Sequence, residues 1–123
     1  MDPLRREITN NQLLPLLQAI EAIRVEDPEM TSTVISVFLY VASHEGCHKQ
    51  AIEEDLGIST SNSSRAADWL LNKKTLRKSG NVGLITKEKD PANNRRITFQ
   101  LTDKGKVMAR KLMDTIYLKE SEL

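Results

Sequence analysis

The chain has 123 residues, of which 39% are hydrophobic, and its formal net charge is +1. This length supports one hydrophobic core but is too short for two ordinary domains, so we expect a single domain over residues 1–123. No run approaches the roughly 18–20 apolar residues of a membrane span, and residues 1–10 are charged rather than signal-like. We therefore expect a cytoplasmic protein, and the lone Cys47, which cannot close an internal disulfide, fits a reducing compartment.

Charge is distributed unevenly along the chain. Residues 1–57 carry 4 Lys or Arg and 10 Asp or Glu, residues 58–101 carry 9 and 3, and residues 102–123 carry 5 and 4. The positive excess therefore lies in the middle third. A basic segment in an otherwise acidic chain is typical of a surface that binds a polyanion, although a solvated face with a chance excess of lysine gives the same count.

Two helices are predicted in the first third of the chain. Apolar residues recur at three- and four-residue spacing over residues 11–24, which is the pattern of an amphipathic helix. Thr31 or Ser32 can cap the next helix, which continues to about His44. This second helix is apolar on nearly every face, so we expect it at the centre of the domain.

A helix, a tight turn and another helix follow. A short helix is predicted over residues 49–56, and a second runs from Ser59 to about Asn72. Gly57 can adopt the positive φ that ends the first helix, and Ser59 or Thr60 can cap the second. The pattern predicts a helix-turn-helix, with Trp69 on the apolar side of its second helix.

The remaining residues predict a hairpin and a last helix. Strands are expected over residues 83–87 and 96–101, joined by a polar, basic tip at residues 90–95. Thr102 can cap a helix whose apolar band continues to the end of the chain. The expected fold is mainly α with a small β-hairpin (α+β): a winged helix-turn-helix core over residues 30–102, with terminal helices in residues 1–28 and 103–123.

This order of elements resembles the MarR family of winged-helix regulators, and two stretches carry the resemblance. The first is the helix-turn-helix: Leu56, Gly57, Ile58 and Ser59, followed by Ser63, Ser64 and Arg65. The second is the wing and the return into the last helix: Gly83, Leu84, Ile85, Asp90, Asn93, Arg95, Leu101, Thr102, Lys104 and Gly105. The resemblance implies a regulator that binds double-stranded DNA and is not an enzyme.

The sequence departs from the family pattern in four places. Asn93 stands where the family usually has a second aspartate, and Glu53 stands where it usually has a small apolar residue. About eight extra residues, 75–82, precede the wing, and one helix follows it where the family commonly has two. The usual effector pocket would lack part of its wall, so we expect no small-molecule induction.

The second helix of the motif is the expected recognition helix. Its first turns can face base edges in the major groove, where asparagine pairs with adenine and arginine with guanine. Asn62 and Arg65 are the candidates for base contacts. Five hydroxyl residues are short enough to reach phosphates, although capping would also explain them: Ser59, Thr60, Ser61, Ser63 and Ser64.

The expected wing and the loop before it supply the remaining DNA contacts. Asn93, Asn94, Arg95 and Arg96 lie at the hairpin tip. The resemblance implies that Arg95 enters the minor groove, where negative potential favours arginine, and Arg96 could equally take this role. The basic loop residues that could reach phosphates are Lys73, Lys74, Arg77 and Lys78, although a solvated charge run would look the same.

A homodimer is expected because the terminal helices carry apolar bands that one small core need not bury. The residues expected to form the dimer interface are Leu13, Leu17, Ile20, Leu112, Ile116 and Tyr117. The alternative is that these bands pack on each other within one monomer. The dimer would read two half-sites of a pseudo-palindrome and repress by occluding a promoter. A protein-interaction module, or a replication or partition component of virus or plasmid type, is the alternative function.

Neither a cofactor nor a metal is expected. His44, Cys47 and His48 lie close in sequence, but three such ligands would need a fourth from elsewhere. The surroundings of Cys47 argue against a lowered thiol pKa, and the sequence has no Gly-rich phosphate loop or nucleophile elbow.

Overall fold

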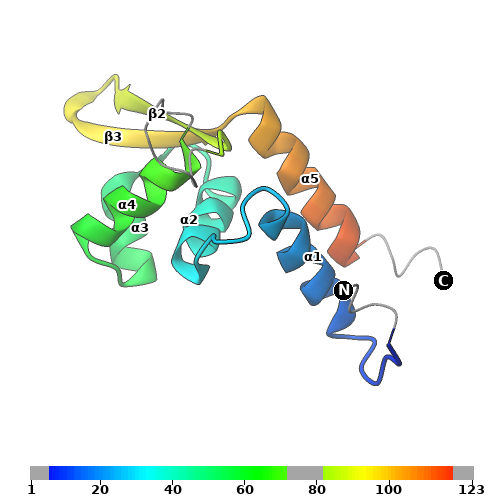
Figure 1. The fold of residues 1–123 in the computed structure, drawn as a ribbon. Coiled ribbons are helices and arrows are strands. Elements are labelled where there is room, and N and C mark those ends of the chain that lie inside the picture. Colours follow the sequence, from blue (N-terminus) through cyan, green and yellow to red (C-terminus); the bar gives the residue numbers. More distant parts are fainter. Residues whose placement is uncertain (1–5, 72–81, 118–123) are drawn as a thin grey trace.

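The computed structural model describes residues 6–71 and 82–117. Within these residues the chain forms α1 (Leu14–Arg24), α2 (Ser32–Ser43), β1 (Cys47–His48), α3 (Lys49–Leu56), α4 (Thr60–Leu70), β2 (Ile85–Asp90), β3 (Asn93–Leu101) and α5 (Asp103–Tyr117). Figure 1 shows α3, α4 and the hairpin at one end of the molecule, α1 and α5 at the other, and α2 between them. This arrangement is a winged helix-turn-helix, as the sequence predicts.

Helix α2 is the centre of the core, as its all-round apolar pattern predicts. Val37, Phe38 and Val41 are almost completely buried. The Thr31 hydroxyl caps the helix by accepting a hydrogen bond from the Val34 amide at 3.3 Å. Because helices α3, α4 and α5 and strand β3 all contact α2, this helix holds the two ends of the molecule together.

The helix-turn-helix forms by the predicted local signals. Gly57 adopts the left-handed conformation, with φ of 64°, and ends α3. Ser59 caps α4 by accepting a hydrogen bond from the Asn62 amide at 3.0 Å. Ile58 packs against the core between the two helices, and Trp69 is half-buried against the same core.

The sheet is larger than the predicted hairpin. Its order is β1-β3-β2 with antiparallel pairing, and β1 pairs Cys47 with Phe99 and His48 with Thr98. Strand β1 has two residues, too few to show the alternation of apolar and polar side chains that predicts a strand. The sequence therefore does not predict β1. The predicted tip at residues 90–95 is also wrong in extent: Asp90 pairs with Asn93, and the strands continue on either side of a turn at residues 91–92.

A clasp of hydrogen bonds holds the segment before β2, residues 82–84, against the start of α5. The Thr102 hydroxyl accepts a hydrogen bond from the Gly105 amide at 2.9 Å and donates one to the Gly83 carbonyl at 2.7 Å. The Lys104 ammonium donates to the Val82 carbonyl at 2.8 Å. A Cβ atom on Gly105 would lie 2.1 Å from the Leu84 carbonyl oxygen, so only glycine fits there.

We predict that Gly105→Ala lowers the free energy of unfolding by about 2 kcal/mol or more, because backbone must move to admit the methyl group. Chemical denaturation measures this loss. Lys106→Ala, on an exposed position of the same helix, is the control and should change stability by less than about 0.5 kcal/mol. Equal stability of Gly105→Ala and wild type would contradict the close approach.

Candidate nucleic-acid interface

The first two turns of α4 present a polar surface. Ser61, Asn62 and Arg65 are exposed, and their spacing places them on one side of the helix. The opposite side, with Ala66, Ala67 and Leu70 among its residues, is buried in the core. The helix therefore offers a hydroxyl, an amide and a guanidinium outward from a rigid support.

Not every hydroxyl of α4 faces outward. Ser63 is only 2% exposed, and its hydroxyl donates to a carboxylate oxygen of Glu53 at 2.6 Å. The prediction that Ser63 contacts phosphate is therefore wrong, because its side chain faces α3. Ser59 is an exposed cap, and Ser64 is half-buried.

The Glu53 carboxylate joins the two helices of the motif. It accepts hydrogen bonds from Lys49 at 2.5 Å, from Ser63 at 2.6 Å and from the Thr60 hydroxyl at 3.0 Å. The hydrogen bonds from Lys49 and Ser63 lower the pKa of Glu53, so its charged form is favoured. This network explains how an acid is accommodated at a position where an apolar residue was expected.

The start of β3, directly after the wing turn, presents Asn93, Asn94, Arg95 and Arg96, all exposed. The Asn93 side-chain oxygen accepts a hydrogen bond from the Arg95 amide at 3.0 Å. Asn93 therefore orders the backbone of the turn, which needs an acceptor oxygen but not a negative charge.

The turn end of the wing is tied to the start of α3. His48 Nε2 lies 2.7 Å from a carboxylate oxygen of Asp90, whose other oxygen accepts a hydrogen bond from the Ala92 amide at 2.9 Å. The hydrogen bond with His48, followed by that with Ala92, lowers the pKa of Asp90, and the nearby charge of Arg96 adds a smaller effect. Residues 42 apart in sequence thus hold the wing in place.

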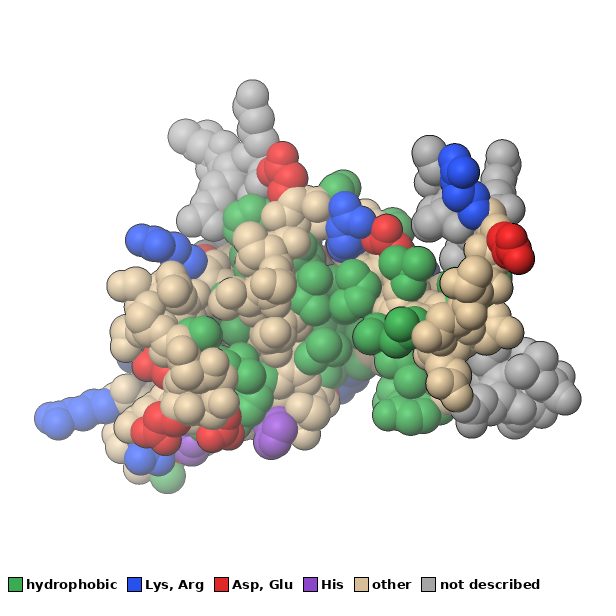
Figure 2. Space-filling view, turned by 90° about the horizontal axis from the view of Figure 1, so that it is seen from below, with side chains coloured by type: hydrophobic (Ala, Val, Ile, Leu, Met, Phe, Trp, Pro, Cys, Tyr) green, Lys and Arg blue, Asp and Glu red, His purple; other side chains and the backbone are tan. Residues whose placement is uncertain are grey.

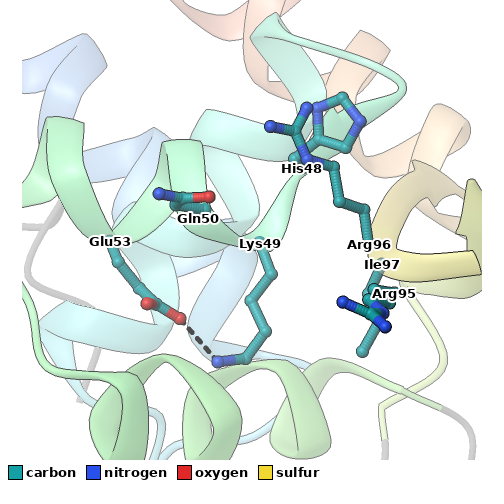
Figure 3. Close-up of a pocket in the computed structure, with 7 residues that line it drawn as sticks. All are labelled: His48, Lys49, Gln50, Glu53, Arg95, Arg96 and Ile97. Atoms are coloured by element: carbon teal, nitrogen blue, oxygen red, sulfur yellow. Dashed lines mark hydrogen bonds and ion pairs between the residues drawn. The ribbon is translucent and has the colours of Figure 1, made fainter. Parts of the chain in front are cut away.

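A hollow of about 340 Å³ lies between the start of α3 and the wing. Figure 3 shows its lining side chains, with Lys49 turned toward Glu53 on one side and the wing arginines on the other: His48, Lys49, Gln50, Glu53, Arg95, Arg96 and Ile97. Three of these seven are lysine or arginine and one is glutamate, so the lining carries a positive excess. The predicted phosphate-contacting residues Lys73, Lys74, Arg77 and Lys78 lie outside the described residues.

The residues expected at a dimer interface divide into two groups. Leu112 is 5% exposed and belongs to the core, so its assignment to the interface is wrong, and Ile20 is half-buried against that core. Leu13, Leu17, Ile116 and Tyr117 are exposed. Helices α1 and α5 pack on each other within the chain, which is the alternative considered from sequence, but their contact does not cover these four residues.

The four exposed residues of the expected interface lie at one end of the molecule. Figure 1 shows α1 and α5 running antiparallel, so the start of α1 lies beside the end of α5. Leu16 and Met113, which are not among the residues predicted for the interface, are exposed there as well. In Figure 2 hydrophobic side chains emerge on the right, the end where Figure 1 places α1.

The histidines and the cysteine engage neighbours of other kinds. His44 stacks on Tyr40 with ring centroids 4.3 Å apart, and His48 binds Asp90. Burial raises the pKa of the Cys47 thiol, which confirms that its surroundings do not lower that pKa. Among the described residues, no group of three His, Cys, Asp or Glu side chains is placed to hold a metal ion, and no helix is long and apolar enough to span a membrane.

Comparison with known proteins establishes the fold. No protein-family profile and no curated protein matches the sequence. Among solved structures, a MarR transcriptional regulator from Methanosarcina mazei Go1 is similar with a TM-score of 0.62 at 16% identity, over 80% of this chain and 63% of that one. The chain thus spans less than two thirds of that regulator.

Two further structures bear on the site. The PcaV regulator from Streptomyces coelicolor, in complex with its natural ligand, is similar with a TM-score of 0.56 at 23% identity, over 90% of this chain and 77% of that one. Reduced AbfR bound to DNA is similar with a TM-score of 0.57 at 16% identity, over 84% of this chain and 69% of that one. The chain therefore has the winged helix-turn-helix fold of MarR-type regulators, which confirms the resemblance at the level of fold.

We predict that Asp90→Asn lowers the melting temperature at pH 7, because the amide keeps an acceptor for Ala92 but cannot accept from His48. The pKa of Asp90 is lowered in the folded protein, so its stabilising effect is present above the unfolded value of about 3.9 and is lost as pH falls through the folded value. The difference in melting temperature should therefore close below about pH 4. Glu88→Gln, exposed on the same strand, is the control. A difference independent of pH would contradict a role for the charge.

Proposed function

We propose that this chain is a transcriptional regulator that binds double-stranded DNA by sequence. The observation that carries the proposal is the outward set of Ser61, Asn62 and Arg65 on α4 together with exposed arginines on the wing. A recognition helix reads base edges with its N-terminal residues, and these three side chains lie in its first two turns. Asn62 and Arg65 supply the groups that pair with adenine and guanine.

The wing complements the helix. Arg95 and Arg96 lie at the start of β3, beside a turn whose backbone amides donate to the side chains of Asp90 and Asn93. An arginine beside an ordered turn can enter a minor groove next to the major groove that α4 would occupy. The AbfR structure, in which a protein of this fold is bound to DNA, supports the same use of the fold here.

The proposal includes a homodimer formed by α1 and α5. Leu13, Leu17, Ile116 and Tyr117 form with Leu16 and Met113 an exposed apolar end, which a second copy would bury. Two recognition helices related by a two-fold axis would read half-sites of a pseudo-palindrome, and occupancy of a promoter would repress transcription.

Two further predictions concern the basic loop before the wing and a small-molecule effector. We retain Lys73, Lys74, Arg77 and Lys78 as phosphate contacts. The absence of a small-molecule effector stays a prediction, and the PcaV structure, which contains a natural ligand, does not favour it.

We predict that Arg65→Ala reduces the preference for a selected duplex over a random one by roughly 1–3 kcal/mol, the value of a bidentate base contact. The selected duplex is obtained with the wild-type chain from a random-sequence pool, and both affinities are measured across a salt series. Arg110→Ala, an exposed arginine of α5, is the control and should leave the preference unchanged. A protein-interaction module would show little duplex affinity at any salt concentration, which would contradict the proposed function.

We predict that Leu17→Glu combined with Ile116→Glu converts a dimer into a monomer, since both side chains lie on the exposed apolar end. Sedimentation or light scattering measures the mass. The control is Val25→Glu, which is equally apolar in the wild type and 78% exposed but lies at the opposite end of α1. A wild-type protein that is already monomeric would refute the interface and leave the DNA-binding surface to be tested separately.

A further inference from the structure

We propose that Glu53 is the positioning residue that sets the orientation of the recognition helix for base reading. The inference rests on the proposed DNA-binding function and deepens it. The Glu53 carboxylate lies within the helix-turn-helix and accepts hydrogen bonds from side chains of both helices.

The three donors to Glu53 determine which part of α4 is held. Thr60 is the first residue of α4, and Ser63 lies one turn later on its buried side. Between them in sequence are Ser61 and Asn62, whose side chains are exposed. Thr60 and Ser63 are both held by one carboxylate, and the backbone between them is helical. The directions of the Ser61 and Asn62 side chains are therefore fixed as well.

The same bonds occupy two of the hydroxyl protons of α4. A hydroxyl has one proton, and those of Thr60 and Ser63 are donated to Glu53. Neither can then donate to a phosphate oxygen. Glu53 therefore concentrates recognition on Ser61, Asn62 and Arg65.

Charge alone predicts the opposite role for Glu53. An acid near a DNA-binding surface repels phosphate, so its removal should tighten binding to any duplex. Lys49 lies 2.5 Å from the carboxylate and donates a second hydrogen bond to the Thr60 carbonyl at 3.4 Å, so the acid is paired within the motif. The positioning role and the charge effect thus differ in sign.

The test compares Glu53→Gln with Glu54→Gln. Both substitutions remove one negative charge from α3, but within the described residues the Glu54 carboxylate accepts only from Gln50, at 3.0 Å in the same helix. The probes are a duplex that the wild-type chain selects from a random-sequence pool and a scrambled duplex of equal length. We expect Glu53→Gln to reduce the selected-to-scrambled affinity ratio roughly tenfold, and Glu54→Gln to leave it unchanged or tighten both duplexes equally.

Amide hydrogen exchange in the free protein supplies a readout that needs no DNA. Glu53→Gln should speed exchange at residues 62–65, and Glu54→Gln should not. Ser63→Ala removes a hydrogen bond to Glu53 but cannot remove a DNA contact, because the Ser63 side chain is buried. It should therefore lower the selected-to-scrambled affinity ratio as Glu53→Gln does. The double variant should be no worse than Glu53→Gln alone.

Three results would overturn the inference. They are an unchanged affinity ratio in Glu53→Gln, additive effects of the two substitutions, or a similar loss of ratio in Glu54→Gln. If Glu53→Gln speeds exchange but keeps the ratio, Glu53 orders the helix without serving recognition, and the inference also fails. If the wild-type chain selects no duplex, the proposed function itself is refuted, a result distinct from all of these.

Discussion

The start of α3 is the constraint on which the geometry of the proposed DNA-binding surface depends. Two adjacent residues there make charged hydrogen bonds in different directions: His48 to Asp90 at the turn end of the wing, and Lys49 to Glu53 beside α4. Because α3 is a short, regular helix packed on the core, it acts as a rigid spacer between the two elements. Helix α4 and the wing are thereby held at a set separation, which the proposed contacts with two adjacent grooves of DNA would require.

The clasp at the start of α5 extends this constraint to the other end of the molecule. The Gly105 position brings α5 against the Leu84 carbonyl, and Lys104 forms an ion pair with Glu26 at 2.8 Å, just beyond the end of α1. The wing, α5 and α1 are therefore connected by backbone contact and by charge. In the proposed dimer, the apolar end of α1 and α5 would set the distance between two recognition helices, so the clasp would couple that distance to the wing.

Local signals in the sequence predict the helices well, but they do not predict contacts between residues that are far apart in the chain. Gly57, Ser59 and Thr102 mark helix ends by chemistry that acts within a few residues, and the structure uses each of them as expected. The His48–Asp90 pair joins residues 42 apart and depends on β1, whose two residues carry no periodic signal. Ser63 was misassigned because a run of hydroxyls looks uniform in sequence, whereas helical geometry turns one member inward toward Glu53.

Two departures from the family pattern are explained by what their side chains bind. Asn93 replaces an expected aspartate, yet its role in the turn is to accept a hydrogen bond from the Arg95 amide, which an amide oxygen performs as well as a carboxylate. Glu53 replaces an expected apolar residue, and it is retained at little electrostatic cost because three donors surround it. A carboxylate that accepts three hydrogen bonds constrains α4 in a way that an apolar side chain could not, because hydrogen bonds are directional and apolar contacts are not.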